Sequence, residues 1–194
     1  MKLWIYLFLA MISTLAGAAE SRDVQWRQVL EAEKAGLPQT AIEALRPIID
    51  GAIRDQAWAE ATKAIGHRIA LESRLEGQKP ETAILRLAQE LERVPPSIQP
   101  LFHTLLGNAY WSYFRQNRWR FAQRTATATA PGTDFTTWDL RRLFAEIDRH
   151  FQIALANDAA LKATPIAQFD ALLEKGTLPD SLRPSLYDFL AREA

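Results

Sequence analysis

The spacing of apolar residues constrains this chain more than any other feature of its sequence. In successive segments, apolar side chains recur at intervals of three and four residues, as at Ile42, Leu45 and Ile49. That interval places them on one face of an α-helix. The sequence contains no convincing period-two alternation bounded by hairpin turns. It therefore predicts an all-α fold with little or no β-sheet.

Glycine and proline divide this pattern into separate helices. Gly36 suits the C-terminal cap of one helix, and Pro38 and Pro80 suit the first turns of later ones. Pro47 falls within an apolar stripe, where a proline is expected to kink or split the helix. The segment that begins at Ser97 is apolar on more than one face, which predicts a central helix covered on most sides.

A short motif occurs twice in the first half of the chain. The pattern Pro-x-Thr-Ala-Ile-x-x-Leu begins at Pro38 and again at Pro80, 42 residues later. That offset matches a helix pair with its turns in helical-repeat proteins, although a chance match between amphipathic helices competes with this interpretation. We expect a short helical-hairpin array, TPR-like or α-solenoid, with an irregular helical bundle as the alternative.

Residues 1–18 have the pattern of a secretory signal peptide. A basic start precedes an apolar run, and the small residues Ala16 and Ala18 suit cleavage after Ala18 or Ala19. The run is shorter than the roughly 20 residues that a membrane-spanning helix needs. We expect an exported protein, periplasmic, cell-surface or secreted, with no stable membrane span after cleavage. Retention of the segment as an anchor is the alternative.

The rest of the chain is expected to contain two helical parts. Residues 19–124 contain the helical-hairpin repeat region, and residues 135–194 form a C-terminal helical segment packed on the same domain. Between them, residues 125–134 are rich in Thr and Ala and contain a Pro-Gly pair, which predicts a loop or linker. The last helical pattern runs to Ala194 with no cap after it, so we expect the beginning of a longer protein.

Charge and cysteine content exclude several classes of function. The 23 basic and 23 acidic side chains balance, so no global field attracts nucleic acid or anionic lipid. The sequence has no cysteine. Disulfides, thiolate metal sites, a cysteine nucleophile and a bacterial lipid anchor are therefore excluded. Export without disulfides is typical of a bacterial envelope protein.

A search for catalytic and metal-binding motifs returns nothing. The three histidines form no HExxH arrangement, and GxSxG, Walker-type and GxGxxG motifs are absent. His103 lies in an apolar segment and is interpreted as a hydrogen-bonded core or boundary residue. His150 lies near Glu146 and Asp148 and is interpreted as a solvated residue on a charged helix face. We expect no enzyme activity, no cofactor and no metal.

Arginine and aromatic residues alternate between residues 115 and 124. Packing of Trp119 and Phe121 is the favoured interpretation, and a docking surface for another domain comes second. Nucleic-acid binding comes last, because the chain is neutral and exported. The candidate docking surface consists of Arg118, Trp119, Arg120, Phe121, Arg124 and Trp138.

Several motifs in the second half of the chain resemble a known family. They are Trp119-Arg120-Phe121-x-Gln123-Arg124-Thr125, residues 134–140, 144–147, 161–166, 172–177 and 183–190. Together they are similar to the N-terminal region of large bacterial alpha-2-macroglobulin-like proteins, over nearly the whole chain from about Trp26. The resemblance implies a helical region followed by β-sandwich domains, in an envelope or surface protein associated with protease entrapment. The family's Cys-Gly-Glu-Gln thioester is absent here, because the chain has no cysteine.

Two hypotheses about function follow. The first is a non-catalytic helical interaction or scaffold module of an exported alpha-2-macroglobulin-like protein, which binds downstream domains of the same polypeptide or another envelope protein. It predicts an exposed aromatic patch near Trp119, Phe121 and Trp138. The second is a free-standing periplasmic helical-repeat protein that binds a peptide or small ligand in a concave groove.

The gene downstream of Ala194 distinguishes these hypotheses. If the first is right, sequencing is expected to show an open frame that continues into β-sandwich sequence. A stop codon followed by an unrelated gene contradicts the first hypothesis and supports the second.

Overall fold

The computed structural model describes residues 22–77, 79–122, 132–170, 172 and 183–193. The chain divides into two compact units, and the boundary lies between Leu75 and Glu76, within the range 19–124. Residues 1–18 and most of the range 125–134 lie outside the described residues.

The described residues are helical, which confirms the all-α prediction. Among them no β-strand occurs, and residues Pro165 and Ser185 form an isolated antiparallel bridge. Around this bridge the Ile166 amide donates to the Pro184 carbonyl at 3.0 Å, and the Leu186 amide donates to the Thr164 carbonyl at 2.9 Å. These bonds join two segments that are distant in the sequence without making a sheet.

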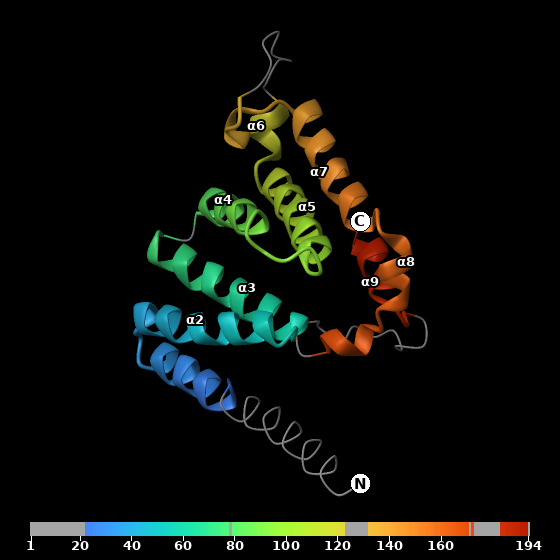
Figure 1. Ribbon diagram of the computed structural model, residues 1–194. Coiled ribbons are helices and arrows are strands. Elements are labelled where there is room, and N and C mark those ends of the chain that lie inside the picture. Colours follow the sequence, from blue (N-terminus) through green and yellow to red (C-terminus); the bar gives the residue numbers. More distant parts are fainter. Residues whose placement is uncertain (1–21, 78, 123–131, 171, 173–182, 194) are drawn as a thin grey trace, which may run out of the picture. The chain divides into compact units, whose positions relative to one another are not determined.

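Unit 1 contains the helix of residues 22–34, α2 (Pro38–Arg54) and α3 (Trp58–Leu75) (Figure 1). Gly36 follows the first helix with φ 71°, a left-handed conformation in which a Cβ atom is disfavoured. Pro38 occupies the first turn of α2, where no helical partner needs its missing N–H. α2 continues through Pro47 as one helix, so the expected split does not occur.

Small and branched side chains pack in unit 1. α2 buries Ala41, Leu45, Ile48 and Ala52, and α2 and α3 pack against each other. The buried face is rotated from the stripe expected from the sequence, because Ala41 is buried and its neighbour Ile42 is only half-buried. Alanine in such a contact allows two helix backbones to approach closely.

Half-buried polar contacts tie the first helix of unit 1 to α3. Arg22 Nε and Trp26 Nε1 both donate to the Glu60 carboxylate, at 2.7 and 2.9 Å. Two turns beyond Trp26 and Glu60, Glu33 Oε2 lies 3.0 Å from His67 Nε2. These contacts fix the register between the two helices.

Unit 2 is built around α5 (Gln99–Gln116), which packs against four other helices. They are α4 (Pro80–Leu91), α6 (Arg118–Ala122), α7 (Leu140–Leu155) and α9 (Leu186–Glu193). The short elements η1 (Phe135–Thr137), α8 (Asp158–Ala163) and η2 (Ile166–Phe169) complete the described part of the unit. The expectation of a central helix that begins near Ser97 is confirmed.

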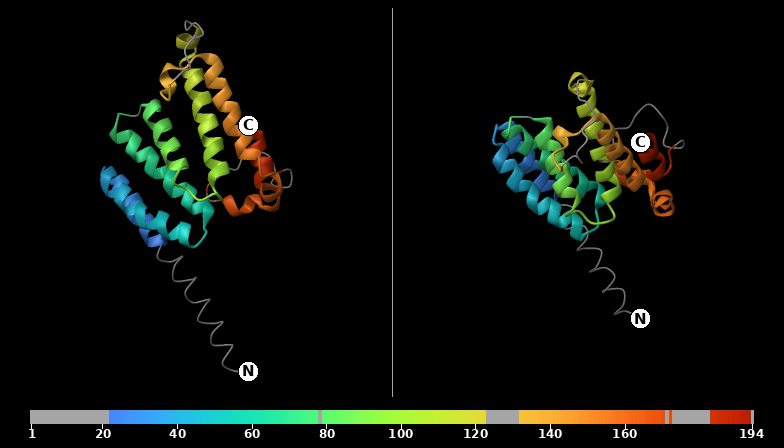
Figure 2. Two further views of the ribbon diagram at one scale, coloured as in Figure 1. Left: turned by 45° about the horizontal axis from the view of Figure 1, so that its top comes forward. Right: turned by 90° about the horizontal axis from the view of Figure 1, so that it is seen from above.

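α5 and α7 lie side by side and run in opposite directions (Figures 1 and 2). Near the end of α5, the Phe114 ring lies 5.0 Å from the Phe144 ring, measured between centroids. Near the start of α5, His103 meets His150. The last turn of α5 therefore lies beside the first turns of α7.

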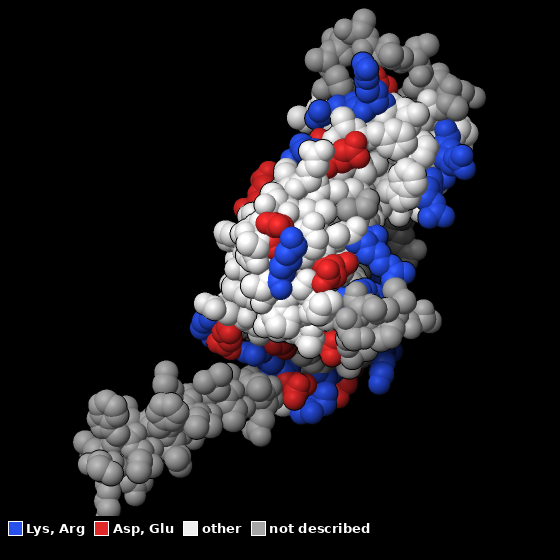
Figure 3. Space-filling model, turned by 90° about the vertical axis from the view of Figure 1, so that its right-hand side faces the viewer, with Lys and Arg blue, Asp and Glu red and all other residues white. Residues whose placement is uncertain are grey.

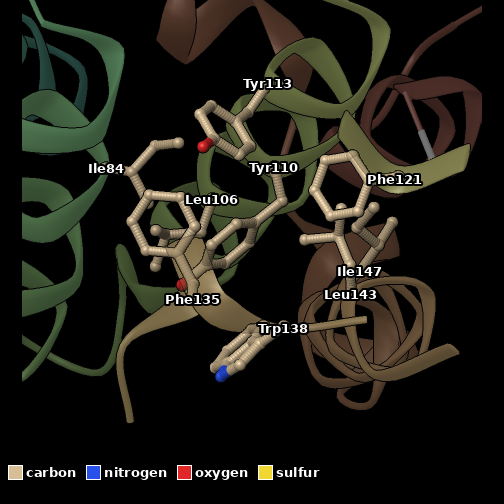
Figure 4. Packing of buried hydrophobic residues seen from close by; sticks show 9 residues of the cluster. All are labelled: Ile84, Leu106, Tyr110, Tyr113, Phe121, Phe135, Trp138, Leu143 and Ile147. Atoms are coloured by element: carbon tan, nitrogen blue, oxygen red, sulfur yellow. The ribbon is translucent and has the colours of Figure 1, made fainter. Parts of the chain in front are cut away.

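Aromatic rings from separate elements fill the core of unit 2 (Figure 4). Phe135 of η1 packs edge-on against Tyr110 and Tyr113 of α5, with centroids 5.4 and 5.2 Å apart. Edge-to-face contacts of this kind add to the stabilisation that burial provides. The buried members of the cluster are Ile84, Leu106, Tyr110, Tyr113, Phe121, Phe135, Trp138, Leu143 and Ile147.

Gly107 of α5 lies at a close contact with α7. A Cβ atom on Gly107 would lie only 2.8 Å from Cζ of Phe151, and two further ring atoms lie at 2.9 and 3.1 Å. Real Cβ atoms almost never approach so closely. The flat Phe151 ring therefore lies where a side chain at position 107 would have to be.

The substitutions Gly107→Ala and Gly66→Ala are expected to differ in their effects on stability. Both replace a glycine inside a helix, which favours folding by up to about 1 kcal/mol. Gly66 has no atom within 4 Å of an added Cβ, whereas Gly107 meets the Phe151 ring, an overpacking that costs about 1–3 kcal/mol. Urea unfolding should show that Gly66→Ala stabilises the protein and that Gly107→Ala does not.

The Phe151→Leu substitution provides the control. Adding Gly107→Ala to Phe151→Leu should cost less than adding it to the wild type, because the ring that it meets is gone. Equal stabilisation by Gly66→Ala and Gly107→Ala would contradict the tight contact.

Candidate functional site

α6 is a short helix that its neighbours hold in place. The buried Phe121 ring packs against the rings of Tyr113 and Phe114, with centroids 6.1 and 5.8 Å apart. Arg120 donates from Nη1 to the Tyr113 hydroxyl at 3.2 Å. Trp119 lies before these two anchored residues, and 65% of it is exposed.

The aromatic residues of the candidate docking surface do not form one patch. Phe121 and Trp138 are each only 4% exposed and belong to the core cluster of unit 2. Trp138 Nε1 also donates to the Gly132 carbonyl at 2.7 Å. The favoured prediction that Trp119 packs is wrong, because an indole that is 65% exposed makes little packing contact. Of the expected aromatic patch, only Trp119 is at the surface.

The arginines of the candidate surface also differ from one another. Arg118 is exposed, whereas Arg120 is half-buried beside Tyr113 and lies 4.0 Å from Glu81. Arg124 lies outside the described residues. Arg118 therefore remains with Trp119 as a candidate contact residue, and Arg120 holds α6 in place.

Sequence reasoning missed a second group of exposed apolar residues, which lie on α5 and α7. Trp111 is 43% exposed and its ring lies 6.1 Å from the half-buried ring of Phe144, measured between centroids. Leu140, one turn before Phe144 on α7, is also exposed. The sequence predicts a central helix covered on most sides, but it does not show that the side of α5 that carries Trp111 is only partly covered by α7.

Arginines lie at the facing ends of α5 and α7. Arg141 lies in the first turn of α7. A positive charge at that position is repelled by the helix dipole, which destabilises the helix by about 0.3–1 kcal/mol. The neighbouring Arg142 is stabilised locally, since it stacks 4.9 Å above the Trp138 ring and lies 3.5 Å from Glu146. Among the described residues, no carboxylate forms an ion pair with Arg115, Arg118 or Arg141.

Basic and acidic side chains are interspersed over much of the face shown in Figure 3. Near the upper end of that face, Lys and Arg side chains border an area without charged residues. A nucleic-acid surface normally carries a continuous basic stripe. The interspersed charges do not match that pattern.

A buried polar cluster lies between α5 and α7. His103 and His150 are 8% and 3% exposed, and their Nδ1 atoms are 2.8 Å apart. Glu146 is also buried, and it accepts a hydrogen bond from Arg149 at 2.6 Å. His103 is thus a hydrogen-bonded core residue, as expected. The expectation of a solvated His150 is wrong, because the face of α7 that carries Glu146 and His150 turns toward α5.

The geometry of the histidine pair limits its protonation. A hydrogen bond between two Nδ1 atoms needs one N–H donor and one bare nitrogen as acceptor. Two protonated rings would point N–H groups at each other across 2.8 Å. The cluster therefore holds the contact between α5 and α7 only while at least one ring is neutral.

Burial and charge shift the pKa values in this cluster. Burial and the nearby Arg149 charge lower the pKa of His150 to about 4, and the same two causes lower the pKa of His103. Burial raises the pKa of Tyr110 to about 12. Burial also acts to raise the pKa of Glu146, but the hydrogen bond and charge of Arg149 outweigh it, so this pKa is lowered.

The protein is expected to lose stability as the pH falls from about 6.5 toward 4. The folded pKa values of His103 and His150 lie below the ordinary value of 6.5, so the unfolded chain binds more protons in this range. Each histidine can contribute up to about 1.4 kcal/mol per pH unit. Chemical unfolding at a series of pH values measures this slope, and nuclear magnetic resonance of the rings measures their titration directly.

The control for this prediction is Gln152→Ala, which changes an exposed, uncharged residue of α7 and should leave the slope unchanged. His150→Gln should reduce it. An unchanged slope in His150→Gln, or a His150 ring that titrates near pH 6.5, would contradict the prediction. Loss of stability below about pH 4.5 is not diagnostic, because the folded pKa of Glu146 is lowered from 4.5 and the unfolded chain therefore also binds more protons there.

Unit 1 contains a pocket of about 230 Å³ between its helix ends. Its lining combines apolar side chains with a loose ion pair, in which Arg74 Nη1 lies 3.6 Å from Glu33 Oε1. Glu33 also contacts His67, so its charge is already satisfied within the unit. The lining residues are Glu33, Gly36, Pro38, Leu71, Arg74 and Leu75.

Comparisons with known proteins give no family for this chain. No protein-family model, no curated protein and no solved structure matches it. Within the described residues, no helix combines the length and apolar character needed to cross a bilayer, and no group of three or more His, Asp or Glu side chains is arranged to hold a metal ion.

Proposed function

We propose that this chain is a non-catalytic helical module that binds another protein through the surface around Trp119. The observation that carries this proposal is an exposed tryptophan on a helix that is itself held in place. Phe121 and Arg120 anchor α6, while the Trp119 indole remains 65% exposed. Tryptophan is enriched among the residues that dominate protein–protein binding, because a rigid indole buries a large area at little entropic cost.

The surroundings of Trp119 support binding to a protein. Trp111 of α5 and Leu140 in the first turn of α7 are further exposed apolar residues of unit 2, and the exposed Arg118 precedes Trp119 in the chain. Apolar centres with arginine at their rims are typical of protein interfaces. The buried histidine cluster has a different part in this proposal. The cluster is buried between α5 and α7, and a substrate would reach it only if those helices separated. We therefore assign it a structural role in the contact between the two helices.

The motifs of the second half of the chain support a more specific proposal. They resemble the N-terminal region of exported bacterial alpha-2-macroglobulin-like proteins, and the secretory pattern of residues 1–18 agrees with export. In that setting, the partner is a downstream domain of the same polypeptide or another envelope protein. The thioester chemistry of the family has no counterpart in this sequence, which lacks cysteine.

A free-standing periplasmic protein that binds a peptide or small ligand is the second candidate function. The pocket of unit 1 favours it, because Leu71 and Leu75 would contact an apolar group beside Arg74. At about 230 Å³ the pocket is smaller than the usual 300–1,000 Å³ of small-molecule sites. Protein binding through Trp119 is therefore the better supported candidate.

Photo-crosslinking in the natural host tests the proposed function. A photo-reactive amino acid at position 119 is expected to crosslink one defined protein or one defined downstream domain. The same amino acid at the exposed position Gln152 is expected to give no such product. Added wild-type chain should compete with the crosslink, whereas Trp119→Ala chain should compete at least about tenfold less well, because loss of a central anchor costs about 2 kcal/mol or more.

The variant Ile153→Ala is the matched control, since Ile153 is an exposed apolar residue of α7. It should compete as well as the wild type. Equal competition by Trp119→Ala, or equal crosslinking from Gln152, would contradict the proposal. Circular dichroism should show unchanged folding of both variants, because each removes an exposed side chain.

A further inference from the structure

Arginine residues lie at the end of unit 2 that carries Trp119. Phe114 packs on both Phe121 of α6 and Phe144 of α7, at 5.8 and 5.0 Å between centroids. α6 and the facing ends of α5 and α7 therefore meet at one end of unit 2. We call this surface the arginine–tryptophan end, and its residues are Arg115, Arg118, Trp119 and Arg141.

The arginines of this surface have no acidic partner among the described residues. The carboxylates at the same end of the unit already accept other bonds. Asp139 accepts from the backbone amide of Arg142 at 2.8 Å, and Asp134 accepts from that of Thr136 at 3.0 Å. Glu81 faces Arg120, which is not part of the surface. The arginine–tryptophan end is thus a local excess of positive charge on a chain with no net charge.

We propose that the arginine–tryptophan end binds an acidic segment of the partner protein. This inference rests on the proposed function and names the chemistry that the same surface recognises. Carboxylates pair with arginine in bidentate geometry, and an apolar side chain of the segment packs on the Trp119 indole. An acidic segment satisfies the three arginines and also removes the repulsion between Arg141 and the dipole of α7.

The observations favour a protein segment over a nucleic acid or a lipid surface. Binding to phosphates is driven by many simultaneous contacts along a continuous basic surface. Here the unpartnered positive charges are few, and exposed apolar side chains such as Trp119, Trp111 and Leu140 lie near them. That combination of an apolar centre and a few arginines is typical of a protein interface.

A binding titration tests the inference. The probe is a fluorescent peptide in which Glu and Asp alternate with Leu and Phe, and its comparator carries Gln and Asn at the acidic positions. The acidic peptide is expected to bind at least about tenfold more tightly than the comparator, and high salt is expected to weaken it, because surface charges are screened. Vesicles containing phosphatidylglycerol and an oligothymidine strand are expected to bind more weakly than the acidic peptide.

Charge reversal shows where the peptide binds. The variant Arg115→Glu/Arg118→Glu/Arg141→Glu should lose at least about tenfold in affinity for the acidic peptide. The matched control Arg27→Glu/Lys34→Glu/Arg46→Glu changes the net charge equally, at exposed positions of unit 1, and should bind as the wild type does. Thermal unfolding of both variants establishes that they fold.

The outcomes separate this inference from the proposed function. Peptide binding that is equally weakened in both variants, or tighter binding of the vesicles or of oligothymidine, overturns the inference. So does a partner that crosslinks at position 119 through a segment without Asp or Glu, and in that case the proposed function stands. Absence of any specific crosslink at position 119 overturns both. Loss of peptide binding in the first variant alone supports the inference.

Discussion

The antiparallel contact between α5 and α7 is the constraint on which unit 2 depends. Gly107 allows the two helices to approach across the Phe151 ring, and the buried histidines satisfy each other within the same contact. Once the register is set, Phe114 meets Phe144, and η1 closes over the tyrosines of α5. The same register brings the last turn of α5 beside the first turns of α7. The surface that we propose for binding therefore depends directly on the packing of the core.

Helix positions were predictable because their signals are local. Pro38 and Pro80 mark the first turns of α2 and α4, and Gly36 ends the preceding helix in a left-handed conformation. Asp139 caps α7, because its side chain accepts a hydrogen bond from the Arg142 amide. These effects act within a few residues, so the sequence alone contains them. The all-α class follows from the same spacing rules.

The roles of individual side chains were less predictable, because they depend on which helix faces are covered. His150 looked solvated beside Glu146 and Asp148, but the face of α7 that carries His150 and Glu146 turns toward α5 and is buried. Trp119 and Trp138 looked alike in the sequence, yet one is exposed and the other is in the core. The difference arises because Phe121 and Arg120 anchor α6 and leave its remaining indole outside. Tertiary contacts decide which of two similar side chains is buried, and short-range sequence patterns do not contain those contacts.

The contact between Gly107 and Phe151 also constrains how this sequence can diverge. A side chain at position 107 and a full ring at position 151 cannot occupy the same volume, so change at one position depends on the other. In relatives that keep this fold, positions 107 and 151 are expected to vary together, and a larger residue at 107 should accompany a smaller one at 151. An alignment of such relatives would then show the close approach of the two helices as paired changes at these positions. The pair would identify distant relatives more reliably than the surface residues that bind a partner.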